Sequence, residues 1–255
     1  MRLKEYFSKE NAQEALRCYA TVAAKRNWQI THKLDLYNRA KIAFEIPGQE
    51  PLKKKAFRLI YDDLRSYWKI FRNTAGTPLP SDQVFDLLVH ECAPVSRESG
   101  TTLVNIETPV YHRTILTCIK KLDCIKPVKS GFSHMAVAKF THFFNPRLFP
   151  IYDNDVVWRR LLCGVFSEDY RQFCRIHNMR ASENGPEFNV NYIRLAGECL
   201  RENSKEVMGI FGKWFRKETE NYTDPTDVRN DMETYFATAF ELVAIGAAAL
   251  EGENF

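Results

Sequence analysis

Residues 129–160 read KSGFSHMAVAKFTHFFNPRLFPIYDNDVVWRR, and the order of features in this stretch decides the expected fold. A glycine turn at Ser130–Ser133 precedes an apolar helical segment, His134–Phe144, and a proline-bounded loop, Asn145–Tyr152. Asp153 then stands where the next helix opens. A helix start exposes unpaired backbone N–H groups, which bind anions and also hold a capping carboxylate. The stretch therefore predicts an anion site and a carboxylate at a fixed separation.

Helical patterns extend outward from this stretch over nearly the whole chain. Between residues 52 and 71, apolar side chains recur at steps of three and four, which is typical of an amphipathic helix. Cap signals predict further helices over about 81–92, 109–122 (after Thr108), 167–178 and 224–250, and two more that are split near Asn203–Ser204. No window alternates in the manner of strands joined by hairpins. We therefore predict an all-α fold.

The chain of 255 residues is long enough to bury a large core. We expect a single two-lobed domain over residues 1–255, with a cleft between the lobes. The break NTAGTPLP at 73–80 is the expected lobe boundary, and about 108–165 form the core around Asp153. The last predicted helix, about 224–250, is acidic.

The net charge of +4 is unevenly distributed. Residues 218–255 carry nine acids and one base, a net charge of −8, so residues 1–217 carry +12. The bases form two clusters in the sequence: Lys53, Lys54, Lys55, Arg58, Arg65, Lys69 and Arg72; and Lys120, Lys121, Lys126, Lys129, Lys139 and Arg147. Such a basic body favours a polyanionic partner. The alternative is a solvated helix face whose charge the acidic segment balances.

The seven cysteines are scattered and include no C-x-x-C pair, so no zinc or iron–sulfur site is expected. We expect small buried thiols in a reducing compartment. The first residues, MRLKEYFSKENAQ, lack the apolar region of a secretory signal, and the apolar run at 242–250 is too short to cross a bilayer. We therefore expect a cytoplasmic protein without membrane contact.

The stretch from about 129 to 160 resembles the helix-hairpin-helix superfamily of DNA glycosylases. The signature of that family is a Gly-apolar-Gly hairpin turn, a helix, a proline-rich loop and a catalytic Asp that opens the next helix. Gly131-Phe132-Ser133 stands at the turn, and Pro150-Ile151-Tyr152 leads into Asp153. The resemblance implies a helix-hairpin-helix-like motif, a double-stranded DNA partner and a monomer.

The resemblance also implies the roles of individual residues. Asp153 would stabilise an oxocarbenium-like sugar and position water while the N-glycosidic bond is hydrolysed. Asp155 is the other acid that could cap this helix. The expected DNA-phosphate contacts are Gly131, Phe132, Ser133, Lys129 and Lys126. Relatives need no metal for the chemistry, although they often hold a monovalent cation on hairpin carbonyls.

Two positions depart from the family pattern. Ser133 replaces the second turn glycine, and Met135 occupies the position where lyase-competent relatives keep a nucleophilic lysine. A thioether forms no Schiff base. We therefore expect a monofunctional enzyme that leaves an abasic site, with Lys139, one helical turn later, as the residue to test for lyase activity.

A glycosylase must take its target base out of the stack and into a pocket. We expect Tyr152, Phe149 and His134 to line that pocket. These residues do not determine the base: oxidised, alkylated, mismatched and hypermodified bases all fit the pattern. Both DNA repair and defence against modified viral DNA are therefore open as roles.

Two other functions remain open. Arg171 and His177 have a spacing used by all-helical, metal-independent ribonucleases of the HEPN type, in which His and Arg act on the 2′-OH and the phosphate. Alternatively, the chain is a non-catalytic helical module that binds DNA or another partner. Cleavage of RNA would support the first, and DNA binding without base release would support the second.

Overall fold

The computed structural model describes residues 2–72, 74–106, 109–129, 132–181, 185–223, 228–253 and 255. Within these ranges the chain is helical and has no β-strand, which confirms the predicted all-α class. The α-helices are α1 (Arg2–Glu5), α2 (Lys9–Arg26), α3 (Ile30–Phe44), α4 (Glu50–Ser66), α5 (Ser81–Glu91), α6 (Pro109–Lys121), α7 (His134–Phe144), α8 (Ser167–Ile176), α9 (Glu187–Arg201), α10 (Ser204–Glu218) and α11 (Phe236–Leu250).

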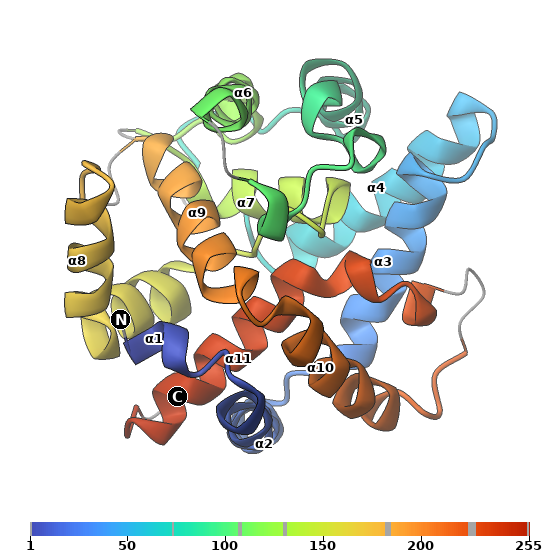
Figure 1. Cartoon of the computed structure of the whole chain (residues 1–255). Coiled ribbons are helices and arrows are strands. Elements are labelled where there is room, and N and C mark those ends of the chain that lie inside the picture. The colour runs from blue at the N-terminus through green and yellow to red at the C-terminus, as the bar shows by residue number, and fades with distance from the viewer. Residues whose placement is uncertain are drawn as a thin grey trace.

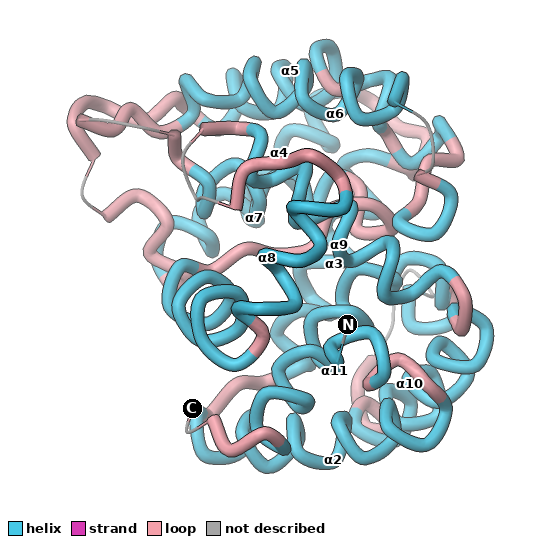
Figure 2. Tube along the Cα trace, turned by 60° about the vertical axis from the view of Figure 1, so that its left-hand side comes forward, coloured by secondary structure: helices cyan, strands magenta, loops and turns pink. Residues whose placement is uncertain are grey.

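Shorter helical elements fill the connections. Six 3₁₀ turns are described: η1 (Ala93–Val95), η2 (Arg97–Ser99), η3 (Leu103–Asn105), η4 (Leu122–Ile125), η6 (Val228–Asn230) and η7 (Met232–Tyr235). The element after Asp153, η5 (Asn154–Val165), is wound as a π-helix. Figures 1 and 2 place α5 and α6 at one end of the molecule and α2 and α10 at the other, with α7, α9 and α11 between them.

Helix α11 forms the centre of the core. Its sequence, FATAFELVAIGAAAL, is apolar around the whole helix, as expected of a helix that is buried on every side. It packs most extensively on α2, where a Cβ at Gly246 would overlap the carbonyl oxygen of Ala15. Glycine here therefore permits the close approach of two helices.

The structure corrects the predicted acidic helix at about 224–250. Helix α11 begins only at Phe236, after the two 3₁₀ turns η6 and η7, and Glu241 is its only acid. The capping signal at Asp224 and Asp227 lies outside the described residues. The acids of the C-terminal segment flank a buried helix instead of forming one charged helix.

Helix starts with strong local signals agree closely with the sequence. Helix α7 covers His134–Phe144 and α6 starts at Pro109, as predicted. The chain also turns between α9 and α10 at the expected break. The stripe over 52–71 is only partly correct, because α4 ends at Ser66 and the side chains of Leu52 and Leu59 are exposed.

The expectation of free thiols is wrong for two cysteines. Cys92, which follows α5, forms a disulfide with Cys118 of α6, across 26 residues of sequence. Among the others, Cys174 and Cys199 are buried, whereas Cys124 and Cys163 are exposed. In the described part of the chain, no group of three or more His, Cys, Asp or Glu side chains is arranged to hold a metal ion. None of the described helices has the length and apolar character needed to cross a membrane.

Candidate active site

A cavity of about 380 Å³ lies beside Asp153, the acid that the sequence singles out. Its wall is built from α2, α3, the segment after α4, α7, η5, α9 and α11, so it draws on nearly the full length of the chain. Two lysines and two carboxylates face it: Lys33, Lys139, Asp153 and Glu241. Five aromatic side chains also line it: Tyr19, Trp28, Tyr67, Trp68 and Tyr192.

Asp153 is fixed by the start of η5. Its Oδ1 accepts hydrogen bonds from the backbone N–H groups of Asp155 (3.0 Å) and Val156 (3.1 Å). Asp153 is therefore the N-cap, as predicted, and Asp155 is not. The capped side chain remains 38% exposed, so the carboxylate is rigidly held and still accessible from the cavity.

Lys139 of α7 reaches the same carboxylate. Its Nζ lies 3.8 Å from Asp153 Oδ2 and 4.9 Å from the ring centroid of Trp68, and its side chain is only 3% exposed. Burial lowers the pKa of the Lys139 ammonium to about 8, although the charge of Asp153 opposes this effect. A lysine in this state supplies an appreciable fraction of neutral amine near neutral pH.

Glu241 and Lys33 form a second ion pair in the cavity wall. Lys33 Nζ lies 3.1 Å from Glu241 Oε2, and the Glu241 side chain is 6% exposed. Its other oxygen, Oε1, accepts the backbone N–H of Ile151, two residues before Asp153. Burial raises the pKa of Glu241, and Lys33 and the Ile151 N–H oppose that rise. Glu241 therefore connects the central helix α11 to the loop that carries Asp153.

A buried series of hydrogen bonds holds the loop that carries Asp153. His142 of α7 lies 2.6 Å from the carbonyl oxygen of Phe149 through Nδ1, and 2.6 Å from the Tyr37 hydroxyl through Nε2. Burial lowers the pKa of His142 well below its ordinary value, so the ring is neutral. In the tautomer that fits, Nδ1–H donates to Phe149, Tyr37 donates to Nε2, and Thr238 completes the chain at 2.5 Å from the Tyr37 hydroxyl.

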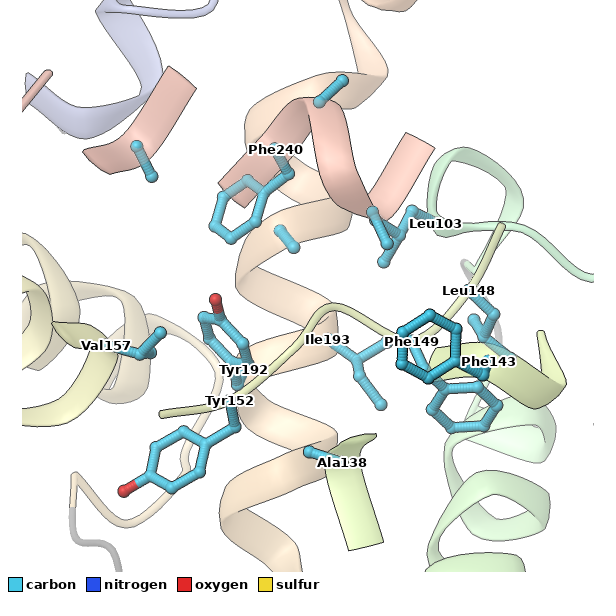
Figure 3. Packing of buried hydrophobic residues seen from close by; sticks show 14 of the residues in the cluster. Leu103, Ala138, Phe143, Leu148, Phe149, Tyr152, Val157, Tyr192, Ile193 and Phe240 are labelled. Atoms are coloured by element: carbon cyan, nitrogen blue, oxygen red, sulfur yellow. The ribbon is translucent and has the colours of Figure 1, made fainter. Parts of the chain in front are cut away.

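The predicted base-pocket residues do not line this cavity. Tyr152 is 1% exposed, and its ring lies 5.1 Å from that of Phe188 and 5.9 Å from that of His134. His134 hydrogen-bonds to Asn189 at 3.0 Å, and Phe149 is buried. Figure 3 shows Tyr152 and Phe149 among the packed core side chains. The aromatic walls come from other parts of the chain, because the loop turns its own large side chains into the core.

The residues of the expected hairpin turn are only partly described. Gly131, one of the expected phosphate contacts, lies outside the described residues. Phe132 is half-buried and packs against the ring of His134, while Ser133 is buried at the start of α7. Lys129 is exposed, but Lys126 is buried, and burial lowers the pKa of its ammonium.

Met135 at the expected lyase position lies outside the cavity, and bases of the two sequence clusters are engaged in ion pairs. Met135 packs against the core and is not among the residues of the cavity, whereas Lys139 is. Several bases of the predicted clusters are engaged in ion pairs, including Lys54 with Asp86 (2.8 Å) and Arg147 with Asp231 (3.2 Å). The sequence clusters are therefore not continuous free basic patches.

The structure does not bring together the ribonuclease pair. Arg171 is exposed on α8 and lies 3.7 Å from Glu168. His177 instead contacts Glu198 at 2.8 Å and Arg194 at 3.1 Å, both on α9.

No pattern in the sequence predicted Lys33, Glu241 or Trp68 as residues of this site. Glu241 did leave a signal, because it is a single acid in an otherwise apolar helix. Lys33 is 208 residues away from Glu241 in the chain, and no local pattern announces their contact.

Comparison of the chain with protein-family models, with curated proteins and with solved structures gave no match.

Proposed function

We propose that this chain is a DNA glycosylase, an enzyme that hydrolyses the N-glycosidic bond of a modified or damaged base turned out of the duplex. The observation that carries the proposal is the position of Asp153, an accessible N-cap carboxylate in the wall of a 380 Å³ cavity. A cavity of this size is within the range that holds small ligands. Its aromatic walls suit a flat ring, and its ionic groups suit the polar edge of a base.

In the proposed reaction the bond between the sugar C1′ and the base nitrogen breaks, and the electron pair leaves with the base. Asp153 stabilises the positive charge that develops on the sugar, since its carboxylate is held by two N–H donors and needs no rearrangement. A water molecule then adds to C1′ and gives up a proton, which leaves an abasic site. The departing base gains a proton.

A second route is favoured by one specific observation. The Lys139 amine, with its pKa lowered to about 8, lies 3.8 Å from Asp153. In this route the amine forms a bond to C1′ while the bond from C1′ to the base nitrogen breaks, and a proton passes from the amine to the departing base. The C1′–O4′ bond then opens to give a Schiff base, the ring oxygen takes up a proton, and elimination from the Schiff base cleaves the strand. Because Met135 cannot act as a nucleophile, water is the nucleophile of the first route. The Lys139 amine is the nucleophile of the second.

The test is a panel of duplexes that contain oxidised, alkylated, mismatched or hypermodified bases. We expect the wild-type protein to create breaks only after alkali, and Asp153→Asn to create none. Asp155→Asn is the matched control, because Asp155 is a neighbouring exposed acid that pairs with Arg160. Breaks that are absent with every base in the panel would contradict the proposal.

Borohydride reduction separates the two routes. Water attack leaves no protein–DNA cross-link. The Lys139 route gives a cross-link in the wild type that disappears in Lys139→Met and persists in Lys129→Met.

A further inference from the structure

Tyr19 of α2 brings a buried hydroxyl to the wall of the Asp153 cavity. The residue is 5% exposed, and its side chain makes ring contacts with Trp28 and Trp214 but no hydrogen bond to a described residue. Burial raises the pKa of this hydroxyl, and the charge of Glu241 adds to the rise, so the hydroxyl keeps its proton. A buried hydroxyl without a partner costs free energy, which a ligand that hydrogen-bonds to it would restore.

Lys139 is a second buried donor in the same wall. It is 2% exposed, and its Nζ lies 3.8 Å from Asp153 Oδ2 and over the ring of Trp68, but it makes no hydrogen bond to a described residue. A lysine side chain carries N–H groups in both of its protonation states, so it remains a donor in either. Neither Lys139 Nζ nor the Tyr19 hydroxyl is among the fully enclosed polar atoms of the described residues. Both atoms are therefore open to a ligand in the cavity.

The carboxylate in the buried part of the wall is already engaged. Glu241 is 6% exposed, its Oε1 accepts the backbone N–H of Ile151, and its Oε2 accepts Lys33 Nζ at 3.1 Å. The hydroxyl of Tyr192 is likewise used, because it donates to the carbonyl oxygen of Ile151 at 3.4 Å. Lys33 uses one N–H group on Glu241 and retains others. The buried wall therefore offers a ligand more donors than acceptors.

The charges of the wall favour a neutral ligand. Lys33 is paired with Glu241, and Lys139 is paired with Asp153, so each cation already has an acid beside it. The aromatic side chains of the wall suit a flat ring. A flat, neutral ring with carbonyl oxygens on its edge would satisfy the donors without disturbing either ion pair.

We propose that the cavity selects bases whose edge carries carbonyl oxygens over bases that carry exocyclic amino groups, with Tyr19, Lys139 and Lys33 as donors to those oxygens. This selectivity rests on the proposed function, which makes the ligand a base, and adds the class of base. An amino group in the same place would set one donor against another and leave both unpaired, which is costly in a buried site. Uracil and hypoxanthine belong to the favoured class, and cytosine and adenine to the rejected class.

Binding of free bases tests the selectivity without any need for catalysis. Calorimetry of the full chain compares uracil with cytosine and hypoxanthine with adenine, and in each pair a carbonyl oxygen replaces an amino group. We expect the carbonyl member of each pair to bind at least about tenfold more tightly. Failure of uracil and hypoxanthine to bind more tightly than cytosine and adenine would overturn the proposal.

Two variants assign the selectivity to the buried donors. Tyr19→Phe removes only the hydroxyl and keeps the ring, and it should weaken the binding of uracil and hypoxanthine roughly threefold to tenfold. Lys139→Met should weaken it by a similar factor. Tyr111→Phe and Lys129→Met, at exposed positions outside the cavity, are the matched controls and should bind as the wild type does. Wild-type affinities in both Tyr19→Phe and Lys139→Met would contradict the assignment, and thermal unfolding of each variant confirms that it is folded.

Release of bases from duplexes separates the selectivity from the proposed function. The duplexes are identical except for the target, which is uracil or cytosine in one pair and hypoxanthine or adenine in the other. Faster release of uracil and hypoxanthine, with a smaller preference in Tyr19→Phe, supports both proposals. Release at equal rates within each pair overturns the selectivity and leaves the proposed reaction in place. Preferential binding of free uracil and hypoxanthine, with no release from any duplex, supports the donor-lined cavity and contradicts the proposed reaction.

Discussion

Lys139 is a buried cation in the candidate site, and its pKa is strongly lowered. Its pKa of about 8 is roughly 2.5 pH units below the ordinary value of 10.5. Each pH unit corresponds to about 1.4 kcal/mol, so the buried ammonium costs on the order of 3 kcal/mol at neutral pH. Lys139→Met keeps the apolar length of the side chain. We expect this variant to have a free energy of unfolding about 2–3 kcal/mol above that of the wild type at pH 7.

The pH dependence of this difference has a definite sign. Between the folded pKa of about 8 and the unfolded value near 10.5, the unfolded chain binds more protons than the folded one. Wild-type stability therefore rises relative to Lys139→Met in this window. Urea unfolding at pH 7, 8, 9 and 10 should show the difference shrinking. A difference that stays constant, or a variant less stable at pH 7, would contradict the assignment; Lys129→Met, at an exposed position, is the control.

Asp153 combines a structural role with the proposed chemical one. Asp153→Ala removes the oxygen that accepts two N–H groups, and loss of an N-cap costs about 1 kcal/mol. Asp153→Asn retains an accepting oxygen, so its free energy of unfolding should stay closer to the wild-type value. Equal losses for both variants in thermal unfolding would show that the cap is not the main contribution. Asp155→Ala provides the baseline for an exposed acid beside it.

The sequence predicted those features of the site that depend only on residues adjacent in the chain. The N-cap position of Asp153 follows from the residues next to it, and the structure confirms this cap. Tyr152 and Phe149 were placed at the pocket because they are near Asp153 in the chain, but their side chains pack into the core. The Lys33–Glu241 pair depends on how α3 and α11 pack, which no local pattern encodes.

At the scale of elements, the contact between α2 and α11 is the critical one. Gly246→Ala would push a methyl group into the Ala15 carbonyl, so the helices would have to separate. We expect a loss of several kcal/mol in the free energy of unfolding, in the range of severe core overpacking.

Gly209→Ala is the matched control for this prediction. Gly209 also lies within a helix, α10, and a Cβ there would meet no atom within 4 Å. Alanine should therefore stabilise the protein by roughly 0.5–1 kcal/mol through its helix propensity. Chemical denaturation of both variants measures these changes in the free energy of unfolding. Similar behaviour of the two would contradict the close packing of α2 and α11.

Element boundaries were predictable where a cap is marked by the sequence. Pro109 and the start of α7 are such cases. The start of α11 was not, because the signal at Asp224 is strong locally while the helix is defined by burial of its apolar residues from Phe236 onward. Tertiary packing decided this boundary.

At the scale of the whole molecule, the uneven charge predicts a salt-dependent affinity for duplex DNA. Each phosphate contact that is lost should make the slope of log affinity against log salt less negative by about one. Lys129 is exposed and is one of the expected phosphate contacts, so we expect Lys129→Gln to change the slope by about this amount. Lys213→Gln, at an exposed position on α10, should leave the slope unchanged. Identical slopes for the wild type and Lys129→Gln would exclude a phosphate contact at Lys129.

The most direct measurement is mass spectrometry of free base released from modified duplex DNA, with wild type, Asp153→Asn and Asp155→Asn in parallel. We expect one free base per product abasic site with the wild type and with Asp155→Asn, and a loss of at least a hundredfold in rate with Asp153→Asn. Free base released by Asp153→Asn at the wild-type rate, or no release by the wild type from any modified duplex, would contradict a glycosylase site at Asp153.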